Sequence, residues 1–148
     1  MGRSSLLDYF GDFARHGTEC AYVYPRGYRH ERWSYRQVAE AAYQFARELQ
    51  ERQIAQGDAI ILWSQNCAEW AAAFWGCALC GVIAVPIDYG ASADFARRIS
   101  AQVNTKLVIC PRERATVFEA IPSIDPVDLV PVIVRHPADP FLPVEIQP

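Results

Sequence analysis

The most regular pattern of apolar and polar positions in this chain follows Ser34. Ser34 and Gln37 form a capping box, in which the hydroxyl and the amide side chain satisfy free backbone N–H groups at a helix start. Apolar residues then recur at spacings of three and four, at Tyr35, Val38, Ala42, Phe45 and Leu49. This spacing places them on one face for about four turns and predicts a long amphipathic helix.

The segment before this helix predicts two further elements. Ser4 to Arg15 carries its apolar residues on one side, which indicates a short amphipathic helix. Ala21–Tyr24 and Tyr28–Trp33 are two short runs of strand-forming residues, joined by a turn at Pro25–Gly27. They predict a β-hairpin.

After residue 57, short apolar runs alternate with helical patterns. The expected strands are Ala59–Trp63, Val82–Val85, Lys106–Cys110 and Val130–Val134. The expected helices are Cys67–Cys80 capped by Asn66, a segment from Ser92 to about Asn104 capped by Ser92, and Arg112–Ala120. The first two strands are almost wholly apolar, as in a sheet covered on both faces. We therefore predict the α/β class, with a mostly parallel sheet, flanking helices and the N-terminal hairpin.

The chain divides by composition near residue 121. Residues 1–121 carry the alternating pattern, whereas residues 122–148 contain seven prolines and one short apolar run. Such a segment is typical of a surface connection rather than of a core. We expect one domain over 1–121, followed by a Pro-rich connection over 122–148.

Composition excludes several classes of protein. A net charge of −3, with Lys106 as the only lysine, gives no basic surface for nucleic acid. The uncharged run from Ala71 to Ile87 reaches the lower limit of a membrane span, but Gly76, Gly81 and Pro86 interrupt it. We expect no transmembrane segment. No signal peptide is apparent either, and the expected location is the cytoplasm.

The cysteines suggest no redox or zinc site. Cys77 and Cys80 have the CxxC spacing, yet they fall at the end of an apolar helix, where the helix dipole disfavours a thiolate. No second CxxC or spaced pair of histidines completes a zinc site. We interpret both cysteines as small buried apolar residues.

Other candidate sites have simpler structural explanations. Gly76 and Gly81 have P-loop spacing, but Val82 and Ile83 stand where Lys and Ser/Thr are required. Asp58 and Asp88 lie at strand ends and suggest paired carboxylates, but Asp in such places more commonly has a turn or cap role. Lys106 is expected in a solvated flank. The sequence therefore predicts no catalytic, cofactor-binding or metal-binding residue in this chain.

A series of short motifs carries a family resemblance. In order along the chain, these are Trp33–Tyr35, Gly57–Asp58, Asn66, Glu69–Trp70, Gly81 and Val85–Asp88. Their order and spacing resemble the N-terminal region of the acyl-adenylating enzymes, closest to the long-chain fatty-acyl-CoA synthetases. The resemblance runs from about Leu6 to the last residues. Family members often have Gly near Gln53, so here a left-handed Gln53 or a frayed helix end is expected.

The resemblance implies an activity that the chain lacks the residues to perform. Family enzymes activate a carboxylic acid with ATP and Mg²⁺, form an acyl-adenylate, and pass the acyl group to a thiol such as coenzyme A. They use a Ser/Thr/Gly-rich phosphate loop with a lysine, an aromatic-Thr-Glu segment, a ribose-binding Asp and a C-terminal lysine. None of these motifs occurs in the printed sequence. Glu69–Trp70 is a recurrent family pair whose expected role is structural.

Two hypotheses of different classes remain open. In the first, the chain is an inactive N-terminal fragment of an acyl-CoA ligase. In the second, it is a standalone interaction module that keeps the subdomain fold and binds a partner, such as the remainder of a ligase or an intact homologue. Acyl chain length, the acceptor thiol and the oligomeric state are not encoded in these residues.

Overall fold

The computed structural model describes residue 2 and residues 4–145. Its strands form a four-stranded parallel sheet and a separate two-stranded hairpin. The strands are β1 (Cys20–Arg26), β2 (Arg29–Ser34), β3 (Ala59–Leu62), β4 (Ile83–Pro86), β5 (Thr105–Ile109) and β6 (Ser123–Ile124). The helices are α1 (Leu6–Phe10), α2 (Asp12–His16), α3 (Tyr35–Glu51), α4 (Ala68–Cys80), α5 (Ala93–Gln102), the 3₁₀ helix η1 (Arg112–Phe118) and α6 (Pro126–Ile133).

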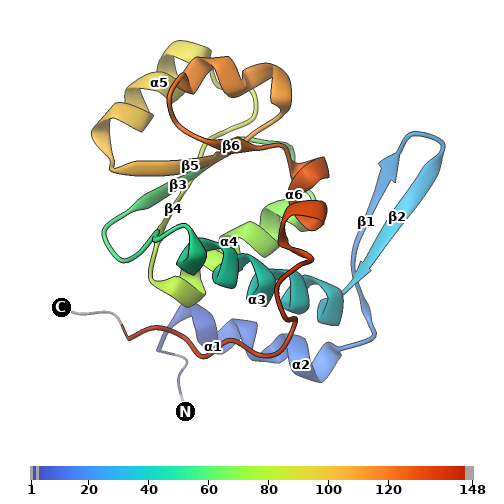
Figure 1. Cartoon of the computed structure of the whole chain (residues 1–148). Helices are drawn as coiled ribbons and strands as arrows, with labels where there is room; N and C mark the ends of the chain where they lie inside the picture. Colours follow the sequence, from blue (N-terminus) through green and yellow to red (C-terminus); the bar gives the residue numbers. More distant parts are fainter. Residues whose placement is uncertain (1, 3, 146–148) are drawn as a thin grey trace.

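The parallel sheet has the strand order β4-β3-β5-β6, and the antiparallel hairpin β1-β2 projects away from it (Figure 1). Alternate residues of β3 and β5 belong to two separate apolar cores. Ile60 and Leu107 pack with α3, α4 and α6, whereas Ile61 and Val108 pack with α5 and η1. Helices therefore cover both faces of the sheet, and the predicted α/β class with its hairpin is confirmed.

Both ends of the long helix α3 follow the sequence signals closely. Gln37 N–H donates to the Ser34 hydroxyl at 3.1 Å, and Ser34 N–H donates to the Gln37 amide oxygen at 2.8 Å. Gln53 takes the left-handed conformation with φ +59°, as expected, and Ile54 N–H donates to Leu49 C=O at 2.9 Å. Both the capping box and the strained stop after α3 are confirmed.

The two central helices pack unusually closely at one glycine. A Cβ atom placed on Gly76 of α4 would lie 2.6 Å from Cδ1 of Phe45 and 3.1 Å from the carbonyl oxygen of Ala42, both on α3. Only glycine fits at this crossing without displacing Phe45. The position of Gly76 within an apolar helix is thus explained by packing, not by phosphate binding.

The main error of the sequence prediction concerns the last strand. Val130–Val134 was expected as strand, but Val130–Ile133 lies in α6 and Val134 is its C-cap, and the fourth strand of the sheet is Ser123–Ile124. The Asp125 side chain accepts a hydrogen bond from Val127 N–H at 3.0 Å, and Pro126 stands in the first turn, where its lost N–H costs nothing. This local start signal outweighs the strand preference of the valines.

Several smaller predictions also need correction. The helix expected over 4–15 is two helices, α1 and α2, which meet at Gly11. The N-cap of α4 is Cys67, not Asn66, and no side chain caps it. The segment expected as helix at 112–120 is the 3₁₀ helix η1. β4 is an edge strand with Ile83 half exposed, because only β3 pairs with it.

The Pro-rich segment after residue 121 is more than a surface connection. Ile124, Leu129 and Ile133 are all buried, the last two completely, so the first part of the segment contributes to the core. The boundary expected at residue 121 stays a prediction.

In the described part of the chain, no helix combines the length and the apolar character that crossing a membrane requires.

Candidate functional site

The topology of the sheet creates a crevice at the carboxyl ends of its central strands. The chain leaves β3 toward α4 on one face and leaves the neighbouring β5 toward η1 on the other. In open α/β sheets, ligands bind outside the strand ends at the point where the connections diverge in this way. The region between the β3 and β5 ends is therefore the candidate site.

A cleft of about 240 Å³ occupies this position. Its lining comes from four strand ends and from the hairpin: Ser64–Cys67, Tyr89, Pro111, Asp125–Val127 and Tyr24–Arg26. A second hollow of about 490 Å³ shares Ser64, Gln65, Asn66 and Tyr89 with it and continues along Pro86–Asp88. We call the two together the strand-end cleft. It presents polar side chains and aromatic surface within one continuous depression.

Arg114 of η1 fixes one wall of the strand-end cleft. Its guanidinium group lies 4.3 Å from the ring centroid of Trp63 and 4.0 Å from that of Tyr89. It also donates to the Tyr89 carbonyl at 2.7 Å, while the Trp63 indole N–H donates to the Asp88 carbonyl at 3.0 Å. A cation between two aromatic faces is a favourable arrangement. The loop after β4 is thereby held against the end of β3.

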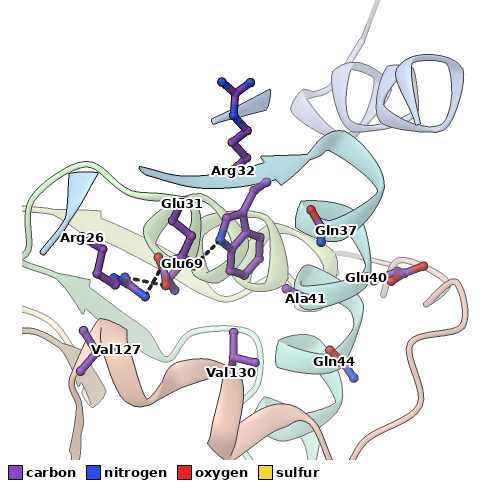
Figure 2. A pocket seen from close by; sticks show the side chains of 11 residues that line it. Arg26, Glu31, Arg32, Gln37, Glu40, Ala41, Gln44, Glu69, Val127 and Val130 are labelled. Carbon is purple, nitrogen blue, oxygen red and sulfur yellow. Dashed lines mark hydrogen bonds and ion pairs between the residues drawn. The ribbon is translucent and has the colours of Figure 1, made fainter. Parts of the chain in front are cut away.

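Glu69 fixes the opposite wall by holding the hairpin. Its side chain is only 2% exposed, and it accepts hydrogen bonds from the Tyr24 hydroxyl at 2.8 Å and from Arg26 at 2.9 Å. Arg26 also pairs with Glu31 at 2.8 Å, and the Trp33 indole donates to Glu31 at 2.8 Å (Figure 2). The hairpin thus meets α4 through one buried carboxylate, whose charge Arg26 balances.

The thiol of Cys67, in the lining of the cleft, is poorly suited to act as a nucleophile. Cys67 lies at the start of α4 and lines the cleft, but burial raises the pKa of its thiol to about 11. The thiol is therefore neutral near pH 7, whereas the thiolate is the reactive form. The geometry of these residues is suited to binding and to holding loops in place.

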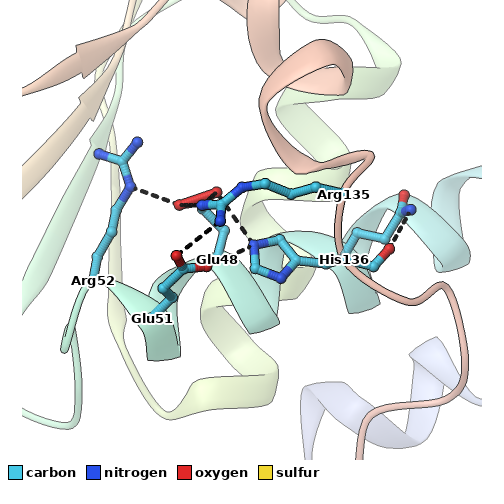
Figure 3. Close-up of polar contacts among 6 residues, drawn as sticks. Glu48, Glu51, Arg52, Arg135 and His136 are labelled. Atoms are coloured by element: carbon cyan, nitrogen blue, oxygen red, sulfur yellow. Dashed lines mark hydrogen bonds and ion pairs between the residues drawn. The ribbon is translucent and has the colours of Figure 1, made fainter.

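A second cluster of polar residues joins the end of α3 to Arg135 and His136, which follow α6. Glu48, 1% exposed, accepts hydrogen bonds from Arg52 at 3.1 Å and from Arg135 at 2.8 and 3.0 Å. Arg135 also binds Glu51 at 2.7 Å, and His136 lies 3.3 Å from both carboxylates (Figure 3). Burial raises the pKa of Glu48, but the hydrogen bonds from Arg52, Arg135 and His136 together bring it below its ordinary value.

Glu48, Glu51 and His136 are near enough to one another to hold a metal ion. Both carboxylates, however, are already bound to Arg135, and Arg52 adds a second positive charge at Glu48. A cation would have to displace these guanidinium groups. The cluster instead attaches the chain after α6 to α3, together with Arg47, which donates to the carbonyls of Pro137 and Asp139.

The residues considered from the sequence are scattered, and none lies in the cleft as a reactive group. Cys77 and Cys80 are buried with raised thiol pKa values, which confirms their apolar role. Asp58 accepts from Ala55 N–H at 3.0 Å, and Asp88 accepts from Gly90 N–H at 2.8 Å, so both have the expected turn roles. Lys106 is exposed.

Sequence inspection missed the groups that shape the site. Glu69 was expected only as a first-turn charge, whereas it also anchors the hairpin. Trp70, expected as a core aromatic, packs against the core and is partly exposed. The roles of Arg114 and Glu48 were not anticipated. A carboxylate within an otherwise apolar helix start, as at Glu69, is the one signal that would have suggested a buried partner.

Comparison with known sequence families identifies the family of this chain. Residues 11–146 match the sequence family described as AMP-binding enzyme. The chain belongs to that family. No curated protein matched the sequence of this AMP-binding family member.

Solved structures share the fold of this AMP-binding family member. The fatty acyl-adenylate ligase from L. pneumophila, solved with acyl adenylate and pyrophosphate, superposes over 97% of the chain with a TM-score of 0.75 and 24% identity. A fatty acid AMP ligase from Legionella pneumophila matches 90% of it (TM-score 0.69, 26% identity), and VinN matches 98% (TM-score 0.77, 21% identity). The chain spans only 26%, 25% and 40% of these three proteins, respectively.

Proposed function

We propose that this chain serves as the N-terminal part of the adenylating domain of an ATP-dependent acyl ligase. The observation that carries the proposal is the family match over residues 11–146, supported by the likeness of the fold to ligases of which the chain spans only a part. In such a ligase, a carboxylic acid would react with ATP to give an acyl-adenylate and pyrophosphate. The acyl group would then pass to a thiol.

The proposed acid is a fatty acid, and the proposed acceptor is coenzyme A. The similarity to two L. pneumophila enzymes named for fatty acyl or fatty acid substrates supports the first choice. The resemblance to fatty-acyl-CoA synthetases supports the second. The chain's own contribution would be a scaffold: a strand-end cleft whose walls are set by Arg114 and Glu69.

The chain alone is proposed to be inactive. Its only lysine, Lys106, is exposed on β5 outside the cleft, and its sequence contains no Ser/Thr/Gly-rich phosphate loop. Stabilising the departing phosphates requires such positioned donors. ATP, Mg²⁺ and coenzyme A would accordingly be bound by the complete ligase rather than by residues 1–148.

Fatty-acid-dependent exchange of pyrophosphate into ATP tests the proposal. The purified chain is expected to give no exchange. A fused protein, in which the chain replaces the corresponding 26% of the L. pneumophila fatty acyl-adenylate ligase, is expected to give exchange. The L. pneumophila ligase without that part is the control and should be inactive.

Two outcomes would contradict the proposal. Exchange by the chain alone would show that it contains a complete active site. A folded fused protein without exchange would favour a different role, namely the interaction module that keeps the subdomain fold without taking part in adenylation.

A further inference from the structure

Helix α6 carries apolar residues on its exposed side as well as on its buried side, and Asp128 is its one charged residue. Leu129 and Ile133 are completely buried in the core on one side. On the other side, Val127, Val130 and Val134 are 53%, 38% and 62% exposed. We call these three valines the valine face. Apolar side chains grouped on the exposed side of a helix mark a surface that other protein can cover.

The valine face borders a groove. A hollow of about 370 Å³ lies between α6, the hairpin and α3, and its lining includes Val127, Val130, Trp33 and Ala41. Val127 and Val130 project from α6 toward the hairpin side of this groove (Figure 2). Val127 and Val130 therefore belong both to the valine face and to the lining of the groove.

Several of the charges around the groove are paired within the chain. Arg26 pairs with Glu31 at 2.8 Å and with Glu69 at 2.9 Å, so this guanidinium group does not call for an anionic ligand. Asp128, on the same helix, pairs with Arg112 at 2.7 Å. The groove is also lined by the polar side chains of Arg32, Gln37, Glu40 and Gln44, so its apolar part is the side formed by α6. Covering the exposed valine side chains there is favourable, which favours a segment with apolar side chains as the occupant.

The length of the structural relatives indicates where that segment comes from. The chain matches almost completely, yet it spans only 26% of the fatty acyl-adenylate ligase from L. pneumophila and 40% of VinN. A second copy of the chain is a weaker candidate, because a stable dimer buries roughly 800 Å² per partner, more than three valines and a small groove offer.

We infer that the valine face and its groove are the surface on which the rest of an adenylating domain packs, through an apolar segment. This inference rests on the proposed function. It adds that α6, whose first residues line the strand-end cleft, forms the contact between this chain and the rest of the domain. The interface would thereby hold one end of the cleft wall, at Asp125–Val127, in a fixed position.

The test compares the same substitution in two contexts. Val127→Glu and Val130→Glu are made in the isolated chain and in the fused protein described above. Val23→Glu is the matched control, because Val23 is also a valine and is 49% exposed, but it lies on β1 outside the groove lining. Thermal unfolding, binding of an anilinonaphthalene dye and light scattering are measured for every version.

In the isolated chain, both α6 variants are expected to fold as well as the wild type and to bind less dye, since they place charge on an open apolar surface. In the fused protein, dye binding of the wild type should be low, and both variants should lower the unfolding temperature by several degrees. Val23→Glu should leave both contexts unchanged.

Three results would overturn the inference. The first is equal tolerance of the α6 variants in both contexts, the second is a fused protein that binds as much dye as the isolated chain, and the third is an isolated chain that is a dimer dissociated by Val130→Glu. Pyrophosphate exchange separates this inference from the proposed function. If the fused protein catalyses exchange and neither Val127→Glu nor Val130→Glu lowers its unfolding temperature, only the interface is contradicted. If both substitutions lower its unfolding temperature but the unsubstituted fused protein catalyses no exchange, only the proposed function is contradicted.

Discussion

The hydroxyl group of Tyr24 donates a hydrogen bond of 2.8 Å to the carboxylate of Glu69, 45 positions later in the chain. Tyr24 belongs to the projecting hairpin, and Glu69 belongs to the first turn of the helix behind the sheet. This contact, with Arg26 beside it, determines where the hairpin stands relative to the strand-end cleft. The pKa of Tyr24 is raised, first by burial and then by its hydrogen bond to Glu69, so the phenol remains a donor.

Tyr24→Phe tests the hairpin anchor. Removing the donor to a buried charged acceptor is expected to reduce the free energy of unfolding by about 1.5–3 kcal/mol. Urea denaturation followed by tryptophan fluorescence measures the change. Tyr28→Phe is the matched control, because Tyr28 is fully exposed at the hairpin turn, and it should change stability by less than about 0.5 kcal/mol. Equal effects of the two substitutions would show that the anchor does not hold.

Glu48→Gln tests the cluster that attaches the chain after α6 to α3. Removing the charge from this buried carboxylate leaves Arg52 and Arg135 without their shared partner, and a loss of about 3 kcal/mol is expected at pH 7. Glu51→Gln is the control. Glu51 is 52% exposed, so its ion pair should contribute no more than about 1 kcal/mol. A larger effect at Glu51 than at Glu48 would contradict this assignment.

The same carboxylate predicts a dependence of stability on pH. The pKa of Glu48 is lower in the folded protein than its ordinary value of 4.5. Its ionised form therefore contributes stability that is fully present above the ordinary pKa and is lost as the pH falls through the lower folded value. Urea midpoints measured from pH 7 to pH 3 should fall less steeply for Glu48→Gln than for the wild type. Parallel curves would contradict the prediction.

Gly76→Ala tests the close approach of α3 and α4. The added methyl group would lie 2.6 Å from Phe45 Cδ1, so Phe45 must move, and overpacking of this kind costs about 1–3 kcal/mol. Gly11→Ala is the control, because Gly11 has an ordinary helical conformation and a Cβ there would make only an ordinary van der Waals contact, 3.5 Å from the Asp8 carbonyl oxygen. That substitution should be neutral or should stabilise the protein by about 0.4–1 kcal/mol. Chemical denaturation measures the free energy of unfolding of both variants, and equal values for the two would contradict the prediction.

Thiol labelling tests the interpretation of the cysteines. Cys20 is exposed, whereas Cys77, Cys80 and Cys110 are buried with raised thiol pKa values, and burial raises that of Cys67 to about 11. Near pH 8 the folded protein should therefore react rapidly with a disulfide reagent at Cys20 alone. All the cysteines should react in urea. Rapid labelling of Cys77 or Cys80 in the folded protein would contradict a purely structural role for that pair.

Local signals in the sequence determined most of the individual elements. The capping box at Ser34 and Gln37 and the buried strand at Ala59–Leu62 are each specified by neighbouring residues. The left-handed Gln53 was one of two outcomes expected from the family resemblance. Such features depend on backbone geometry and on the spacing of apolar side chains, both of which can be inferred within a short window. The α/β class and the family resemblance followed from their order.

The tertiary structure alone decided the rest. The helix at the valines after Pro126 had a local start signal in the Asp125 cap, but only the fold shows that Leu129 and Ile133 are buried in the core on one side of it. The roles of Glu69 and Glu48 depended on partners 43 to 88 positions away. A side chain buried by distant elements gains its charge balance only when the chain has folded, so no local pattern reveals it. The valine face likewise became visible only when the covered side of α6 was known.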